Sequence, residues 1–346
     1  MTLPTGTISL SQVNTELDIS PSSTTINMGA TAVRTLADAP SGAIAMSDLQ
    51  GKSNAQFIQA TGGTIATQGD FKVHTFNSNA TFTVQGVGNE AGSNTVEYLV
   101  VAGGGSGGAG YGGGGGAGGY RTNFPSPASG GLPVSAQGYP ITIGGGASGA
   151  PNARYTTKGQ DGSNSTFSSI TSEGGGGGGA LEPQYGGAQG LSGGSGGGAG
   201  AANSSPSTAD GAGNSPPVSP PQGNPGGHAF GVPSPYRGGG GGGGASETGG
   251  NAPSSPAAGG AGGDGTANSI TGSPVTYAGG GGGGVYPDSG VPNAPGGDGG
   301  GGNGGGPSTG QAGGTNLGGG SGAAGGLRNG SNSGGSGKVV IRYKFQ

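Results

Sequence analysis

Side chains that perform acid–base, nucleophilic or metal chemistry are scarce in this sequence. The 346 residues include two histidines, no cysteine and 15 aspartates and glutamates. His74 lies in a predicted strand, where we expect it to face solvent, and His228 lies in a predicted loop. Neither has a second histidine or a pair of carboxylates near it in the sequence, so no hydrolytic triad or zinc site is predicted. We therefore expect a protein that is not an enzyme, with no catalytic residue, no metal site and no cofactor.

Three short motifs resemble nucleotide or calcium sites but lack essential parts. G-x-G-x-x-G occurs many times, yet a dinucleotide site needs a helix after it, which glycine runs disfavour. Gly51-Lys52-Ser53 matches the end of a phosphate-binding loop, but Met46 stands where that motif requires its first glycine. Residues 259–264 match part of a calcium-binding nonapeptide in one imperfect copy, whereas such sites need tandem copies. None of the three predicts a site.

Glycine dominates the composition, with 97 of the 346 residues, while hydrophobic residues make up 28% and charged residues 8%. A typical globular domain is about 45–50% apolar and about 25% charged, so this chain has little material for an ordinary side-chain core. Its low charge also separates it from the usual disordered chains. The net charge of -4 is spread thinly without a basic stripe, so nucleic acid is not an expected partner.

The sequence shows neither a membrane segment nor a secretion signal. No stretch reaches the roughly 18 apolar residues that a membrane span needs. The start, Met1-Thr2-Leu3-Pro4, lacks a basic region followed by an apolar run. We expect no membrane insertion, and release of the product by lysis or particle assembly.

An 18-residue repeat is visible in residues 1–55. Ile8, Ile26 and Ile44 recur in similar frames, and each frame leads into a short helical pattern. Three units with small apolar faces cannot build a large core, so each needs a neighbour to bury against. We interpret residues 1–55 as a module that docks on another chain of a virus particle; the alternative is a small independent helical domain.

Apolar residues of these repeats are the candidates for docking to the particle. The first helical face is formed by Leu10, Val13 and Leu17, and either Ser9 or Ser11 can cap its helix. The full set of docking candidates is Ile8, Leu10, Val13, Leu17, Ile26, Met28, Ile44 and Met46.

Residues 56–102 have the pattern of β-strands. Residues 71–76 and 81–84 alternate apolar and polar side chains around the turn residues 77–79, which predicts a hairpin. Residues 95–102 are apolar enough to be covered on both faces. The C-terminal stretch, residues 338–346, is a further strand, which we expect to pair with this β region.

Residues 103–337 alternate between nearly pure glycine runs and varied segments rich in Pro, Ser, Asn and Tyr. Gly/Ser-rich chains are usually flexible linkers, but these runs are nearly pure, recur many times and are closed by strands at both ends. Collagen requires a strict Gly-X-Y period, which the runs do not keep.

An ordered alternative is a bundle of polyglycine II helices. Such extended helices have no internal hydrogen bonds, so glycine lets neighbours approach and exchange peptide hydrogen bonds. The fold class that we predict is mainly β and irregular. It consists of a polyglycine II helix bundle over 103–337, closed by a small antiparallel β region (56–102 with strand 338–346), and a small N-terminal helical repeat module at 1–55.

Several fragments of the chain resemble the glycine-rich domains of bacteriophage tail-fibre proteins. The frame Val96-Glu97-Tyr98-Leu99-Val100-Val101-Ala102-Gly103-Gly104-Gly105 resembles the beginning of those domains. Further fragments fit the same pattern in the same order: Gly118-Gly119-Tyr120-Arg121-Thr122, Tyr139-Pro140-Ile141-Thr142-Ile143-Gly144, Gly162-Ser163-Asn164-Ser165-Thr166-Phe167 and Gly337-Lys338-Val339-Val340-Ile341-Arg342-Tyr343. The resemblance covers about residues 60–346.

The architecture also resembles the tip adhesins of long tail fibres in T-even-like phages. Those adhesins stack polyglycine II helices and present variable loops to a host receptor. Residues 1–55 resemble the start of many marine-phage structural proteins, and they depart from the T-even adhesins. The resemblance therefore implies a fold and an adhesive role, with no catalytic residue, and it does not imply how the chain attaches to the particle.

Aromatic residues in the varied segments are the candidates for receptor binding. Tyrosine offers rigid amphipathic contact area at a low cost in conformational entropy. Some of these rings are expected to pack under the turns instead. The best candidates lie beside proline or in polar loops, and they are Tyr155, Phe230, Tyr236 and Tyr286.

The expected function is that of a phage tail-fibre or adhesin protein, located on the virion and extracellular after release. Expected partners are other virion proteins, through residues 1–55, and a bacterial surface protein or glycan. A homo-oligomer is also expected, a trimer by analogy with other fibres. The alternative is a purely structural fibre, decoration or filament subunit. A depolymerase would need a pair of carboxylates in a groove, which the sparse acids disfavour.

Overall fold

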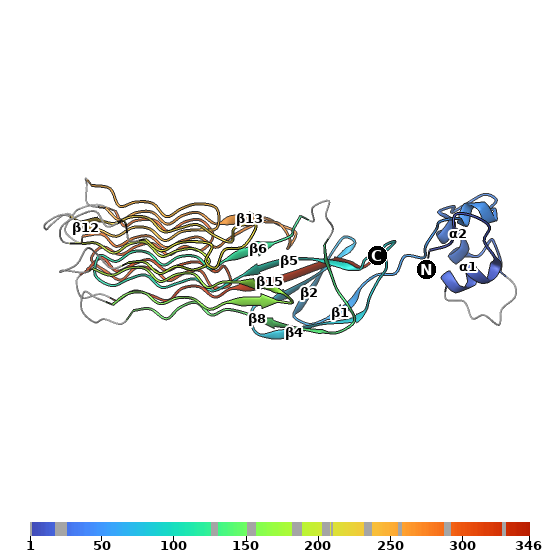
Figure 1. The fold of residues 1–346 in the computed structure, drawn as a ribbon, viewed down its shortest axis with the longest axis horizontal. Coiled ribbons are helices and arrows are strands. Elements are labelled where there is room, and N and C mark those ends of the chain that lie inside the picture. Colours follow the sequence, from blue (N-terminus) through green and yellow to red (C-terminus); the bar gives the residue numbers. More distant parts are fainter. Residues whose placement is uncertain are drawn as a thin grey trace.

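The chain forms an elongated body in which three kinds of structure follow one another (Figure 1). Short helices lie at one end, β-sheets in the middle and extended glycine-rich segments at the other end. The computed structural model describes residues 2–17, 26–125, 131–150, 157–181, 189–202, 208, 210–231, 237–254, 258–286, 292–326 and 330–346.

The N-terminal module is built from three short helical turns: α1 (Leu10–Glu16), α2 (Thr31–Ala37) and the 3₁₀ helix η1 (Met46–Leu49). Ser9 caps α1 in a capping box, because its hydroxyl accepts from the Gln12 N–H while the Gln12 side chain accepts from the Ser9 N–H. Of the two predicted caps, Ser9 and Ser11, the structure shows Ser9. Six buried residues form the core of the module: Leu3, Val13, Val33, Leu36, Ala37 and Leu49.

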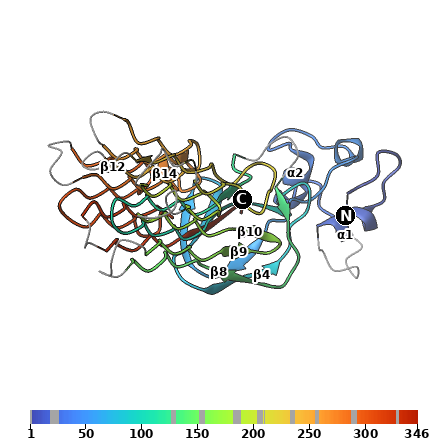
Figure 2. The same ribbon diagram turned by 60° about the vertical axis from the view of Figure 1, so that its left-hand side comes forward.

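Two antiparallel sheets make the middle of the molecule. One has the order β1 (Gln59–Thr61), β4 (Ala80–Gly86), β8 (Gly138–Thr142), β9 (Ser165–Phe167) and β10 (Ile170–Ser172). Figure 2 shows β4, β8, β9 and β10 side by side. The other has the order β2 (Thr64–Gln68), β3 (Phe71–Phe76), β15 (Lys338–Lys344), β5 (Thr95–Val101) and β6 (Tyr120–Thr122), and β7 (Leu132–Pro133) also pairs with β5.

The C-terminal strand closes the glycine-rich stretch onto the β region, as predicted. β15 lies between β3 and β5, with Val339 opposite Phe76 on one side and Val100 on the other. The two ends of the glycine-rich stretch therefore leave from neighbouring strands, β5 and β15.

The predicted hairpin between residues 71–76 and 81–84 is wrong. β3 pairs with β2 and β15, whereas β4 pairs with β1 and β8 in the other sheet. The turn at residues 77–79 carries the chain from one sheet to the other, so that Phe76 and Phe82 enter the same core from opposite sides. Both arrangements bury alternate side chains, and the alternation alone cannot distinguish them.

The six-stranded sheet is covered on both faces. Its face toward the five-stranded sheet carries Val339, Ile341 and Tyr343, within an aromatic core. Its opposite face carries Val340 and Leu99, which pack in one cluster with Ile270 and with Tyr277 of β14 (Val275–Tyr277), the strand that pairs with β13 (Thr266–Asn268). This double burial confirms the prediction made for residues 95–102.

His74 is buried between the two sheets, with no exposed surface, so the prediction that it faces solvent is wrong. Its Nδ1–H donates to the Gly62 carbonyl at 2.7 Å, and its Nε2 accepts from the Tyr343 hydroxyl at 3.2 Å. The ring of Phe82 meets the imidazole edge-on at 5.1 Å. Both ring nitrogens are satisfied, which is what allows a polar ring in an aromatic core.

Peptide groups hold the glycine-rich segments together. Successive N–H groups of one run donate to several different neighbouring segments, so each run is bonded on several sides. The bonds of the run at 113–115 are Gly113 N–H to Gly179 O (2.8 Å), Gly114 N–H to Gly240 O (2.9 Å) and Gly115 N–H to Ser321 O (2.9 Å).

The predicted fold class is wrong, because the structure shows no polyglycine II helix bundle. Over the residues that the structure describes, the regular elements are antiparallel β-strands, two short α-helices and η1. Among the described residues of 103–337, the elements present are short strands, and no helix is among them. Segments that carry side chains, such as β13 and β14, pair as ordinary antiparallel strands. The glycine runs between them are extended chain that bonds to its neighbours through peptide groups.

The close approach of these segments predicts opposite effects for two Gly→Ala substitutions. A Cβ on Gly281 would lie 2.0 Å from the Ser321 carbonyl oxygen, whereas a Cβ on Gly145 would meet no atom within 4 Å. We expect Gly281→Ala to reduce the free energy of unfolding by about 1–3 kcal/mol or more. Gly145→Ala is the matched control and should leave it unchanged or raise it by about 0.4–1 kcal/mol. Thermal unfolding followed by circular dichroism measures both; equal midpoints would contradict the packing described.

Burial of His74 predicts that stability falls in mild acid. Burial lowers the pKa of His74 below 6.5, the Gly62 hydrogen bond raises it, and Lys72 lowers it. The unfolded chain therefore binds more protons than the folded chain near and below pH 6.5. The contribution of neutral His74 to the free energy of unfolding is fully present above pH 6.5. It is lost as the pH falls from there through the lower pKa of the folded state, by at most about 1.4 kcal/mol per pH unit.

The measurement is the unfolding midpoint between pH 7.5 and 5.5, above the ordinary range of carboxyl groups. We expect the slope to flatten in His74→Phe. A parallel series in His228→Asn removes the other histidine, so a slope that persists there and vanishes in His74→Phe belongs to His74. An unchanged slope in His74→Phe would show that this imidazole is not the group responsible.

Candidate functional site at the distal end

Among the described residues, short strands and bends between glycine-rich segments lie at the end of the molecule farthest from the helices. β11 (Phe230–Gly231) pairs there with β12 (Arg237–Gly238), and Gly238 forms a bridge to Val285. Figure 1 shows β12 at the end opposite α1 and α2. We call this region the distal end.

A small aromatic cluster anchors one of these turns. Tyr111 is only 2% exposed and contacts Leu181 and Ala201, while the ring of Tyr286 stacks on it with centroids 5.6 Å apart. We call these four residues the distal aromatic cluster. The Ala201 N–H donates to the Tyr111 carbonyl at 3.1 Å.

The backbone of Tyr111 is strained. Its φ of +53° lies in the left-handed region, which is uncommon for residues other than glycine. The surrounding contacts must offset a cost of about 1–3 kcal/mol. Sequence reasoning overlooked Tyr111; its only signal was a single aromatic residue among glycines.

Two of the four predicted receptor-binding residues lie at the distal end. Phe230 is half-buried in β11, and Tyr286 is half-buried beside Val285, so the bridge at Gly238 places their segments next to each other. Tyr155 and Tyr236 lie outside the described residues.

One ionisable pair lies near this end. Nδ1 of His228 is 2.8 Å from Oδ1 of Asp210, with the histidine side chain 45% exposed. Asp210 is a single carboxylate that the fold brings to His228, a contact that sequence reasoning did not predict. Within the described part of the chain, no group of three or more His, Cys, Asp or Glu residues could hold a metal ion.

The predicted docking residues of the helical module mostly serve its own core. Val13 is completely buried, and Leu10, at 44% exposed, is the most accessible of the set. The others are half-buried against the core: Ile8, Leu17, Ile26, Met28, Ile44 and Met46. Mutual burial leaves less apolar surface for a partner than the sequence suggested.

A chain of polar contacts connects the helical module to the sheets. The Glu16 carboxylate accepts from the Asn54 N–H at 2.8 Å, and the Asn54 carbonyl accepts from the Asn89 side chain at 2.7 Å. Asn89 also accepts from the Gln56 N–H at 3.0 Å. Residues 53–56 are thus held from both sides.

Together these features describe an elongated β protein with a helical end and a distal end that carries β11, β12 and the distal aromatic cluster. The chain belongs to the glycine-rich domain family, whose model matches residues 77–344. No curated protein matches the chain. Over the residues that the structure describes, no helix is both long and apolar enough to span a membrane.

Proposed function

We propose that the chain is a tail-fibre or adhesin protein of a phage virion. Residues 1–55 attach to other virion proteins, and the distal end binds a protein or glycan on the bacterial surface. The observation that carries the proposal is the polarity of the molecule: the helical module and the distal turns lie at opposite ends of an elongated body (Figure 1).

The glycine-rich segments suit the role of a spacer between the two ends. They are connected by backbone hydrogen bonds in several directions, and each such bond contributes about 0.5–1.5 kcal/mol net. Binding then depends on the turns, where the side chains lie. Half-buried aromatic residues at such turns supply contact area with little entropy left to lose.

One observation favours the purely structural alternative. Tyr111 is buried and Tyr286 stacks on it, so at least part of the aromatic surface at the distal end stabilises the fold itself. A fibre or decoration subunit without a receptor would need the same contacts. The two functions differ in whether the exposed faces of Tyr286 and Phe230 touch a cell.

Adsorption of particles distinguishes the two functions. Phage that carry Tyr286→Ala or Phe230→Ala should adsorb to the host about tenfold more slowly or worse, as expected when a central aromatic contact is removed. Ile65→Ala, at an exposed apolar position on β2, is the control and should adsorb normally. As a control for assembly, the number of variant particles, counted by electron microscopy, and their protein content, measured by gel electrophoresis, must equal those of the parent phage. Normal adsorption by both aromatic variants would favour the structural function.

A further inference from the structure

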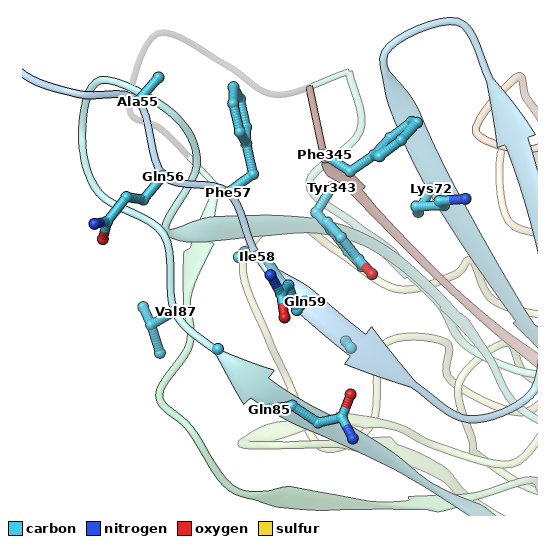
Figure 3. A pocket seen from close by; sticks show the side chains of 12 residues that line it. Ala55, Gln56, Phe57, Ile58, Gln59, Lys72, Gln85, Val87, Tyr343 and Phe345 are labelled. Atoms are coloured by element: carbon cyan, nitrogen blue, oxygen red, sulfur yellow. The ribbon is translucent and has the colours of Figure 1, made fainter. Parts of the chain in front are cut away.

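A groove lies where the two sheets separate, near the helical module. It has a volume of about 690 Å³, which falls within the range of small-ligand sites. Residues 55–58, β1 and β4 form one side of the groove, and the ends of β3 and β15 form the other (Figure 3). Apart from Ala55, the last residue of the N-terminal module, the groove contains none of the residues assigned above to docking or to receptor binding.

Three aromatic rings line the groove: Phe57, Tyr343 and Phe345. Their positions are set by neighbours. The Tyr343 hydroxyl is bonded to His74, and the Lys72 ammonium lies 4.5 Å from the centre of the Phe345 ring. Tyr343 is almost fully buried, whereas the half-buried rings of Phe57 and Phe345 offer flat apolar surface without a large loss of side-chain entropy on binding.

A β-bulge supplies polar groups opposite these rings. Gln59 pairs with Gly86 and Ala60 pairs with Val84, so Gln85 is an extra residue on β4. Bulges re-aim side chains and occur beside binding sites. The amides of Gln59 and Gln85 line the groove, and Gln56 adds a third. Each amide can both donate and accept, as is needed to bind adjacent hydroxyl groups.

Gly86 lines the groove without a side chain. A Cβ at this position would lie 3.7 Å from the Gln59 Cβ, which is an ordinary contact, so the site tolerates a side chain but lacks one.

The charges around the groove are positive. Among the twelve lining residues, all within the described part of the chain, none carries a carboxylate, and Lys72 is the one charged member. The ammonium of Lys344, which is not among the lining residues, lies 5.6 Å from the centre of the Phe57 ring. An anionic group on a ligand would meet the Lys72 ammonium and no carboxylate of a lining side chain.

We propose that this groove binds an acidic saccharide. The apolar face of a sugar ring would stack on Phe57 or Phe345, the glutamine amides would bind its hydroxyl groups, and Lys72 would attract its carboxylate. Glycoside hydrolysis uses a pair of carboxylates, so the site binds the sugar without cleaving it. The inference does not depend on the function proposed for the distal end.

The test is to titrate the full chain with a trisaccharide of glucuronic acid. Isothermal titration calorimetry measures the affinity, and saturation-transfer NMR detects the bound sugar. The neutral glucose trisaccharide is the comparison ligand. We expect the acidic sugar to bind several-fold more tightly than the neutral one, and Lys72→Gln to remove most of that preference, as for a partly exposed charge pair. Equal binding of both sugars would overturn the charge argument, and binding of neither would overturn the site.

Two further variants locate the binding. Gly86→Leu should fill the groove, and Phe345→Ala should remove a stacking surface; each should weaken binding about tenfold or more. Gly86→Ala is the matched control for the first, because it adds one methyl group in ordinary contact. Unfolding midpoints confirm that each variant is folded. Unchanged affinity in both folded variants would place the sugar elsewhere and overturn the proposal.

Discussion

Neighbouring glycine-rich segments lie so close together that their peptide groups can form hydrogen bonds only where no Cβ stands between the two backbones. Most of the glycine-rich part depends on that constraint. At Gly281 the missing Cβ would lie 2.0 Å from a neighbouring carbonyl oxygen, and the N–H of the same residue donates to Gly115. Backbone bonds thus replace side-chain burial as the source of cohesion, which accounts for an ordered structure with 28% hydrophobic residues. The cost is the large conformational entropy that glycine loses on folding.

Side-chain packing stabilises the structure at both ends of the glycine-rich segments. At one end the two sheets bury a conventional aromatic core, and β15 fixes the far end of the glycine-rich stretch beside its beginning. Tyr343 on that strand bonds to His74 in the core and also lines the groove, so one strand takes part both in closing the fold and in forming the groove. At the distal end Tyr111 performs a similar anchoring role on a smaller scale.

Sequence reasoning succeeded where a local pattern determines the structure. The alternation in residues 338–346 predicted a strand that closes the fold, and the observed cap, Ser9, was one of the two that the sequence predicted. It failed where partners are distant in the sequence. His74 alternates with apolar residues like any solvent-facing position, but its carbonyl and hydroxyl partners come from other strands. The fold class was wrong for a related reason: composition shows that glycine segments can approach closely, and it does not show which neighbours their peptide groups choose. The stacking of Tyr286 on Tyr111 likewise spans distant segments.

Hydrogen–deuterium exchange over residues 103–337 tests the central claim most directly. If peptide bonds between segments hold the array, the amides of runs such as 113–116, 240–243 and 280–283 exchange slowly, with protection that approaches the free energy of global unfolding. Amides of the distal turns should exchange faster. Complete exchange of the glycine runs within seconds would contradict the account, because a stretch that open would be a flexible linker without an ordered distal end.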